Sequence, residues 1–166
     1  MAVTDGHLLF KSDLYNKNQR PAIDIASSVT RVGRQTQFLV NSLLSDRIRR
    51  ILSAASDLQT LSSLSQELPP ESQLILKQKG LIETIFRQDN LTLIPLNIQT
   101  ILLGLVFTSF FNDQSVELLS QEKEKLIKQL AKDKSVAAIS NNLPTMKSDE
   151  ELIKVLEKII PELKKL

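Results

Sequence analysis

RPAIDIASSVTRVGRQTQ, residues 20–37, separates two parts of the sequence that differ in their hydrophobic pattern. The stretch HLLF, residues 7–10, and the alternating, β-branched run PAIDIA, residues 21–26, are typical of short strands joined by a polar turn. From about Arg34 onward, apolar residues recur at steps of three and four, the period of an amphipathic helix. The sequence therefore predicts a short β edge followed by helices.

Prolines and capping residues predict where the first helices begin and end. The long helix after Arg34 cannot continue through Leu68-Pro69-Pro70, because proline lacks an amide proton and the residue before it leaves the helical region. A second helix is expected over about 72–87. A third, buried helix is expected to be capped by Asn97 and to end near Phe111.

Two further helices are expected in the last third of the chain. Asp113 or Ser115 can begin one of them, and SDEE, residues 148–151, is a capping box for the other. Pro161 is expected to distort the final turn. The predicted fold class is mainly α, a helical bundle preceded by β-strands that are incomplete, since an isolated strand pair is only marginally stable.

Composition excludes several classes of protein. The 166 residues suit one domain, or one domain and part of another, and the net charge of +2 favours neither nucleic acid nor an anionic membrane. With no cysteine there is no disulfide framework and no thiolate metal site. The most apolar run, residues 98–111, is shorter than the roughly 20 residues that span a bilayer, so we expect no direct membrane insertion.

Few residues could carry chemistry of their own. The four glycines are isolated, so no glycine-rich phosphate loop is present. His7 is the single histidine, and a partly exposed strand residue is the favoured interpretation; no metal ligands are predicted. Arg47, Arg49 and Arg50 could bind nucleic acid, but no aromatic residues are interleaved with them, which favours a solvated helix face.

Arg20 and Arg31 remain as candidates for phosphate recognition. Pro21 holds Arg20 in an extended segment, and Arg31 lies in a short loop that ends at Gly33. The planar guanidinium group matches phosphate oxygens, but surface arginines are common, so the chemistry alone favours ordinary surface residues over phosphate recognition.

The same stretch resembles a known family. TDG at 4–6, RPAI at 20–23, SV at 28–29 and RVG at 31–33, with Gln37 after them, occur in the order found near the end of the nucleotide-binding domain in alpha subunits of F-type ATP synthases. That family typically has TDG, RPAIN and SVSRVG there. ESQLILKQKGLIETIFRQDN, residues 71–90, followed by Pro95 and Gln99, is similar to a helical segment of the same subunits. The resemblance covers residues 4 to about 105.

The resemblance implies roles for five residues. The arginine of SRVG in this family reaches into the catalytic site of a neighbouring beta subunit, which makes Arg31 an arginine finger supplied in trans. The family encloses the adenine of the alpha subunit's own non-catalytic nucleotide with an RP dipeptide and two polar residues of a K-Q-x-Q loop. Those match Arg20, Pro21, Gln88 and Asn90.

Some positions depart from the family pattern. Asp24 stands where alpha subunits usually have asparagine, and Asn90 is shorter than the usual glutamine. Arg34 replaces a small residue beside the Arg31 loop, and residues 65–70 are less acidic than the turn that faces the rotor in the family.

The resemblance also implies a domain organisation and partners. Residues 1–33 would be the end of the nucleotide-binding domain and residues 34–166 the C-terminal helical domain. The chain would then be a C-terminal fragment, inactive alone, of a proton-translocating ATP synthase. The full subunit would bind ATP or ADP with Mg²⁺ and contact beta subunits and the central-stalk gamma subunit. The complex would lie peripherally on the cytoplasmic face of a bacterial inner membrane, and the fragment alone would bind no cofactor.

Two alternatives belong to other functional classes. A stand-alone helical adaptor could have kept this fold without taking part in catalysis. A basic helical protein that binds nucleic acid is disfavoured, because the positive charges are not clustered in excess.

Overall fold

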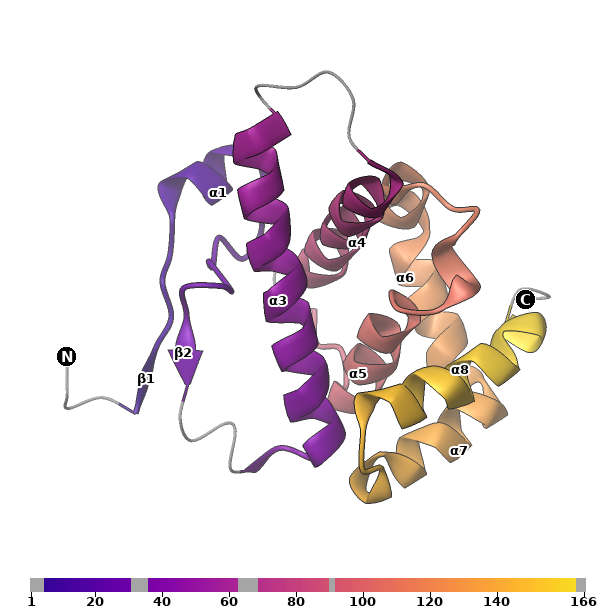
Figure 1. The fold of residues 1–166 in the computed structure, drawn as a ribbon. Helices are drawn as coiled ribbons and strands as arrows, with labels where there is room; N and C mark the ends of the chain where they lie inside the picture. The colour runs from indigo at the N-terminus through magenta and orange to yellow at the C-terminus, as the bar shows by residue number, and fades with distance from the viewer. Residues whose placement is uncertain (1–4, 31–35, 63–68, 90–91, 164–166) are drawn as a thin grey trace.

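The computed structural model describes residues 5–30, 36–62, 69–89 and 92–163, and it confirms the mainly α fold class. Two very short strands and a one-turn helix precede the longer helices (Figure 1). The early elements are β1 (Gly6–His7), α1 (Ser12–Asn16) and β2 (Val29–Thr30). The later helices are α3 (Leu39–Ser62), α4 (Pro70–Phe86), α5 (Leu96–Leu105), α6 (Val116–Lys132), α7 (Lys134–Asn142) and α8 (Asp149–Leu163).

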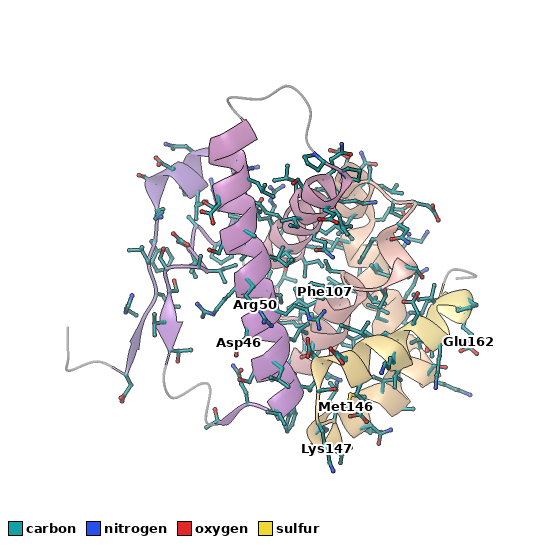
Figure 2. The ribbon with its side chains drawn as sticks, in the orientation of Figure 1. Asp46, Arg50, Phe107, Met146, Lys147 and Glu162 are labelled. Atoms are coloured by element: carbon teal, nitrogen blue, oxygen red, sulfur yellow. The ribbon has the colours of Figure 1, made fainter. Side chains whose placement is uncertain are left out.

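Helix α3 lies between the strand-bearing segment and the other helices (Figure 1). It packs on α4, α5 and α8, while α5 also contacts α6 and α7. Apolar residues from all of these helices form one continuous core, and side chains fill the space between the helices (Figure 2). Burial of this core is the main favourable contribution to folding.

Two of the predicted helix starts are confirmed. The Ser115 hydroxyl accepts a hydrogen bond from Leu118 N at 3.2 Å and caps α6. The Ser148 hydroxyl accepts from Glu151 N at 3.1 Å, and the Glu151 carboxylate accepts from Lys147 N at 3.0 Å. The capping box therefore forms, with its return bond one residue earlier than in the usual arrangement.

The bounds predicted for the buried helix are wrong at both ends. Its N-cap is Pro95 and not Asn97, and no side chain caps it. At the other end α5 stops at Leu105, because the Thr108 hydroxyl donates to Leu105 O at 2.7 Å and accepts from Phe110 N at 3.2 Å. Thr108 thus ends one helix and caps the 3-10 turn over Ser109–Phe111.

The last third of the chain contains a helix that the sequence pattern did not distinguish. Asp133 ends α6, and its carboxylate accepts a hydrogen bond from Val136 N at 3.0 Å to begin α7. A short 3-10 turn, Leu143–Thr145, follows α7. Helix α8 continues through Pro161 to Leu163.

The strand arrangement also differs from the prediction. β1 pairs antiparallel with β2, with Gly6 opposite Thr30 and His7 opposite Val29. PAIDIA forms only an isolated bridge, between Ile23 and Phe10, and is not a regular strand. Its ladder is short because Pro21 has no amide proton to donate and because the chain turns after Asp24.

None of the helices in the described part of the chain has the length and apolar composition that crossing a bilayer requires. The predicted domain boundary between residues 33 and 34 falls outside the described residues and stays a prediction.

Candidate functional site

The two segments predicted to enclose an adenine lie against each other. The Gln88 amide, just beyond the end of α4, donates a hydrogen bond to the Arg20 carbonyl at 2.8 Å. The Gln19 side chain adds a longer contact, from Nε2 to Glu83 O at 3.4 Å. Residues 68 positions apart are thereby joined through their main chains, which brings Gln88 next to the Arg20-Pro21 dipeptide.

The Arg20 side chain folds back on its own loop. Its guanidinium lies 3.7 Å from the centre of the Tyr15 ring, within the range of a cation–π contact. NH1 of Arg20 also donates to Tyr15 O at 2.8 Å and to Gln19 O at 3.1 Å. Pro21 is exposed beside it, and Gln88 is half-buried.

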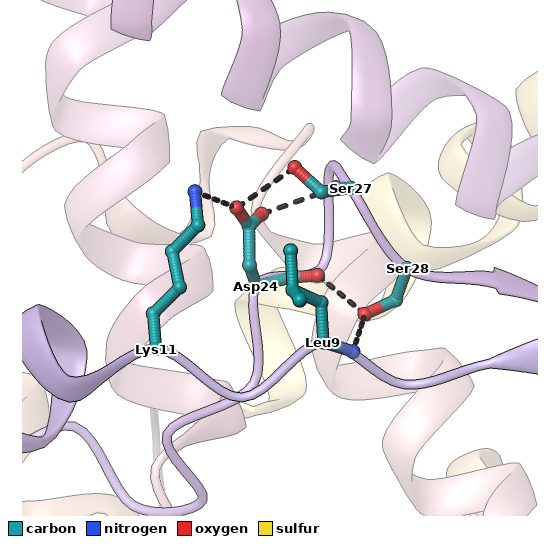
Figure 3. Close-up of polar contacts among 5 residues, drawn as sticks. All are labelled: Leu9, Lys11, Asp24, Ser27 and Ser28. Carbon is teal, nitrogen blue, oxygen red and sulfur yellow. Dashed lines mark hydrogen bonds and ion pairs between the residues drawn. The ribbon is translucent and has the colours of Figure 1, made fainter.

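Asp24 organises the segment between Arg20 and β2 (Figure 3). Its carboxylate binds Lys11 Nζ at 2.5 Å and accepts from the Ser27 amide at 3.1 Å and from the Ser27 hydroxyl at 2.8 Å. The hydrogen bond from Lys11, aided by those from Ser27, lowers the pKa of Asp24 from its ordinary 3.8 to about 2. The position where the family usually has asparagine therefore holds an ionised carboxylate.

Ser28 connects this turn to the segment that follows β1. The Ser28 hydroxyl donates to Asp24 O at 2.5 Å and accepts from Leu9 N at 3.1 Å, as Figure 3 shows. The main chain adds a bond from Asp24 N to Leu9 O at 2.8 Å. Ser28 is buried, and the hydrogen bonds of its side chain hold the turn 24–28 in place just before β2.

Arg49, on α3, binds the main chain of the same turn, residues 24–28. NH1 of Arg49 donates to Ile25 O at 3.0 Å and to Ser28 O at 2.9 Å. Arg47 binds a different element, because its Nε donates to Oδ2 of Asp149, the first residue of α8, at 2.5 Å. The prediction of a solvated helix face is therefore wrong for Arg47 and Arg49, because both guanidinium groups hold other parts of the chain; Arg50 is exposed as predicted.

A lysine on α6 also contacts the end of α4. Lys123, on α6, donates from Nζ to Thr84 O at 3.1 Å and to Arg87 O. Burial lowers the pKa of Lys123 from its ordinary value, against the favourable charge of Asp89. These residues and Gln88 are part of the lining of a cavity of about 240 Å³. Sequence reasoning missed Lys123, because nothing distinguishes it from the other lysines of EKEKLIK.

Two of the five candidate site residues, Arg31 and Asn90, lie outside the described residues. Arg31 directly follows β2 in the sequence, so the contacts of Ser28 and Arg49 hold the segment that leads to it. His7 is an exposed strand residue, as predicted, and the described ranges contain no group of three or more histidine or acidic side chains that could hold a metal ion.

The chain is similar to curated proteins over nearly its whole length. It is 28% identical over 163 residues to ATP synthase subunit alpha 1 of Listeria monocytogenes. This match covers 98% of this chain and 33% of that protein. It is 29% identical over 153 residues to ATP synthase subunit alpha 1 of Mycoplasmopsis pulmonis, with 92% of this chain and 28% of that protein covered.

A shorter and more similar match is to ATP synthase subunit alpha of Mesomycoplasma hyopneumoniae, at 34% identity over 90 residues, which are 54% of this chain and 18% of that protein. A scan against protein-family models found no match. The chain spans about a third of the length of the curated relatives that match it most fully. Along nearly all of its sequence, the chain is thus similar to the C-terminal third of ATP synthase alpha subunits.

Proposed function

We propose that this chain is the C-terminal part of a non-catalytic, regulatory alpha subunit in a rotary ATP synthase that couples ATP synthesis to proton transport. In this proposal Arg20, Pro21, Gln88 and Asn90 form part of the adenine pocket for the subunit's own nucleotide. Arg31 reaches a neighbouring beta subunit. The observation that carries the proposal is the 2.8 Å hydrogen bond from Gln88 N to Arg20 O, which unites two motifs that the family uses together.

The arrangement around Gln88 supports recognition of a purine. Pro21 offers an apolar surface for the flat ring, and the side-chain amide of the half-buried Gln88 offers both a donor and an acceptor. Arg20 is stacked on Tyr15, so its guanidinium is already ordered before a ligand arrives. Ordering in advance reduces the entropy that binding would cost.

The role of Arg31 rests on its place in the sequence and on what holds the segment before it. An arginine finger stabilises negative charge that develops on the transferred phosphoryl group, and its effect depends on accurate placement. Arg49 and Ser28 hold the turn that leads into β2, and β2 ends one residue before Arg31. A residue that directly follows an anchored strand in the sequence is suited to such placement.

The remaining parts of the proposal concern the assembled complex. Its partners would be beta subunits and the central-stalk gamma subunit, on the cytoplasmic face of a bacterial inner membrane. ATP or ADP with Mg²⁺ would bind to the complete subunit. The phosphate-binding residues would come from other parts of the complete subunit, because these 166 residues contain no glycine-rich phosphate loop. The chain alone is therefore expected to show no ATPase activity with Mg²⁺, whatever its state of folding.

The two arginine roles can be tested separately in the complete subunit, assembled with its partners. Arg31→Ala should lower multi-site ATP turnover by about 10³- to 10⁵-fold, the range seen for arginine fingers, and leave nucleotide binding nearly intact. Arg31→Lys should restore little, because an ammonium cannot reproduce the forked contact. Steady-state turnover and equilibrium nucleotide binding are the measurements.

Arg20→Ala is the matched comparison. It should weaken nucleotide binding at the non-catalytic site and leave the chemical step unchanged. Near-normal turnover in Arg31→Ala, or a larger loss of turnover in Arg20→Ala than in Arg31→Ala, would refute these assignments.

A further inference from the structure

The end of α4 is stabilised by a cation from a different helix. The last carbonyl groups of a helix have no partner within it, and a positive charge nearby is favourable because the helix dipole is negative at that end. At α4 the cation is Lys123, whose ammonium donates to Thr84 O at 3.1 Å and to Arg87 O. Lys123 lies on the middle of α6, which packs against α4.

This contact lies immediately beside the candidate adenine pocket. Arg87 is the residue at which the chain leaves α4, with extended backbone angles, φ −66° and ψ 121°. The next residue, Gln88, donates its amide to Arg20 O. Residues 87 and 88 are thus held from two sides, by Lys123 at the Arg87 carbonyl and by Arg20 at the Gln88 amide.

The surroundings of Lys123 favour a fixed contact over a mobile surface lysine. Its side chain is half-buried, and Asp89 and Glu124 are the acidic groups whose charges act on it, with Arg87 acting in the opposite sense. When an ammonium loses part of its hydration, carbonyl oxygens that replace the lost water favour its charged form and hold it in place. The Thr84 and Arg87 carbonyls supply that replacement.

We propose that Lys123 is a positioning residue for the adenine side of the pocket: by binding the last carbonyls of α4 it sets the direction in which Gln88 leaves the helix. The proposal rests on the proposed function for its consequence, since Gln88 must face a nucleotide for that direction to matter. It also links α6 to the pocket, although no residue of α6 belongs to the family motifs described above.

Hydrogen exchange in this chain tests the positioning itself. Lys123→Met keeps the length of the side chain and removes the donors, so the Gln88 amide should exchange at least about tenfold faster, the effect of losing one good hydrogen bond. Lys123→Arg should keep most of the protection, because a guanidinium can still donate to both carbonyls. Amides of the buried residues Ile101 and Leu152 should not change, which separates local loosening from loss of the fold.

Lys125→Met is the matched control, since Lys125 is exposed two residues further along α6. It should leave the exchange of the Gln88 amide unchanged. Unchanged exchange of Gln88 in Lys123→Met, or equal acceleration in Lys123→Met and Lys125→Met, overturns the proposal. If Lys123→Met lowers the protection of the core amides as well, protection of Gln88 in Lys123→Arg equal to the wild type supports the proposal, and loss of protection at Gln88 and the core amides alike in that variant overturns it.

Nucleotide binding to the complete subunit in the assembled complex separates this proposal from the proposed function. Lys123→Met should weaken ATP binding at the non-catalytic site by about tenfold, with catalytic-site turnover unchanged and with Lys123→Arg close to the wild type. Faster exchange of Gln88 with unaltered ATP affinity would support the positioning role of Lys123 and refute the adenine role assigned to Gln88.

Discussion

The guanidinium of Arg47, on α3, binds the carboxylate of Asp149 at the first residue of α8, with 2.5 Å between Nε and Oδ2. The same guanidinium lies 5.4 Å from the centre of the Phe107 ring. Asp149 is also among the few polar residues buried with the core. One arginine therefore ties together the first long helix, the segment after α5 and the start of the last helix.

Arg47→Ala should destabilise the chain by about 2 to 3 kcal/mol. Loss of one partner of a buried ion pair costs roughly 3 to 5 kcal/mol, and the partial exposure of Arg47 reduces this. Urea denaturation followed by circular dichroism is the measurement. Arg50→Ala, at an exposed position of the same helix, is the control, and an equal loss in both variants would contradict a special role for the Arg47–Asp149 pair.

The Asp24 network should make stability depend on pH in the acid range. Because the pKa of Asp24 is lowered from 3.8 to about 2 in the folded chain, its ionised form stabilises the fold above about pH 4. That contribution should disappear as the pH falls from about 4 to about 2. The difference in stability between the wild type and Asp24→Asn should therefore be largest near neutral pH and shrink toward pH 2.

Lys11→Met provides a second measure of the same network, because Lys11 is the main cause of the lowered pKa. It should raise the pKa of Asp24 and move the loss of stability to higher pH. Denaturation of the three proteins at several pH values tests this. A stability difference between the wild type and Asp24→Asn that does not change between pH 7 and pH 2 would speak against it.

Gly6→Ala should separate β1 from β2. A Cβ atom at position 6 would lie 2.6 Å from Val29 O and 2.9 Å from Thr30 Cα, and these backbone atoms cannot move away without breaking the pairing. Faster exchange of the amides around residues 6–7 and 29–30, with unchanged helical circular dichroism, is expected. Leu8→Ala, at an exposed neighbouring position, should leave this exchange as in the wild type.

Gly104→Val should disturb the contact between α5 and α8. A Cβ atom there would lie 2.7 Å from Leu156 Cδ1 and 3.2 Å from Leu152 Cδ2, and both leucines are completely buried. Overpacking of a core typically costs about 1 to 3 kcal/mol, and a branched side chain places this change at the upper end. Thermal unfolding should show the loss, and Gly80→Ala, whose nearest neighbour is the Val116 side chain at 3.0 Å, should cost less.

The sequence predicted elements well where a single local signal decides the structure. Ser115 and Ser148 were identified as helix starts because a hydroxyl that caps its own helix needs only residues three positions away. Proline explains the start of α4 in the same local way. The meeting of Arg20 with Gln88 was predicted only through the family resemblance, since no local pattern connects them.

Predictions failed where a polar side chain takes a backbone group from a regular strand or helix, and where a side chain binds a distant part of the chain. The alternating pattern of PAIDIA favours a strand, but the Asp24 carboxylate takes the Ser27 amide and turns the chain. The apolar run after residue 98 favours one long helix, but Thr108 takes the Leu105 carbonyl. Arg47 and Arg49 were predicted to be solvated because no aromatic residues are interleaved with them, and only the tertiary structure shows what each of them binds.

The bond between Gln88 and Arg20 has a consequence for how this pair of segments can change in evolution. Because it joins an amide to a carbonyl, it does not depend on which side chains occupy the two positions, with proline at position 88 as the exception. The two loops can therefore stay together while their side chains are exchanged. Under the proposed function, a substitution at either position would change which ligand is recognised while leaving the place where it is recognised unchanged.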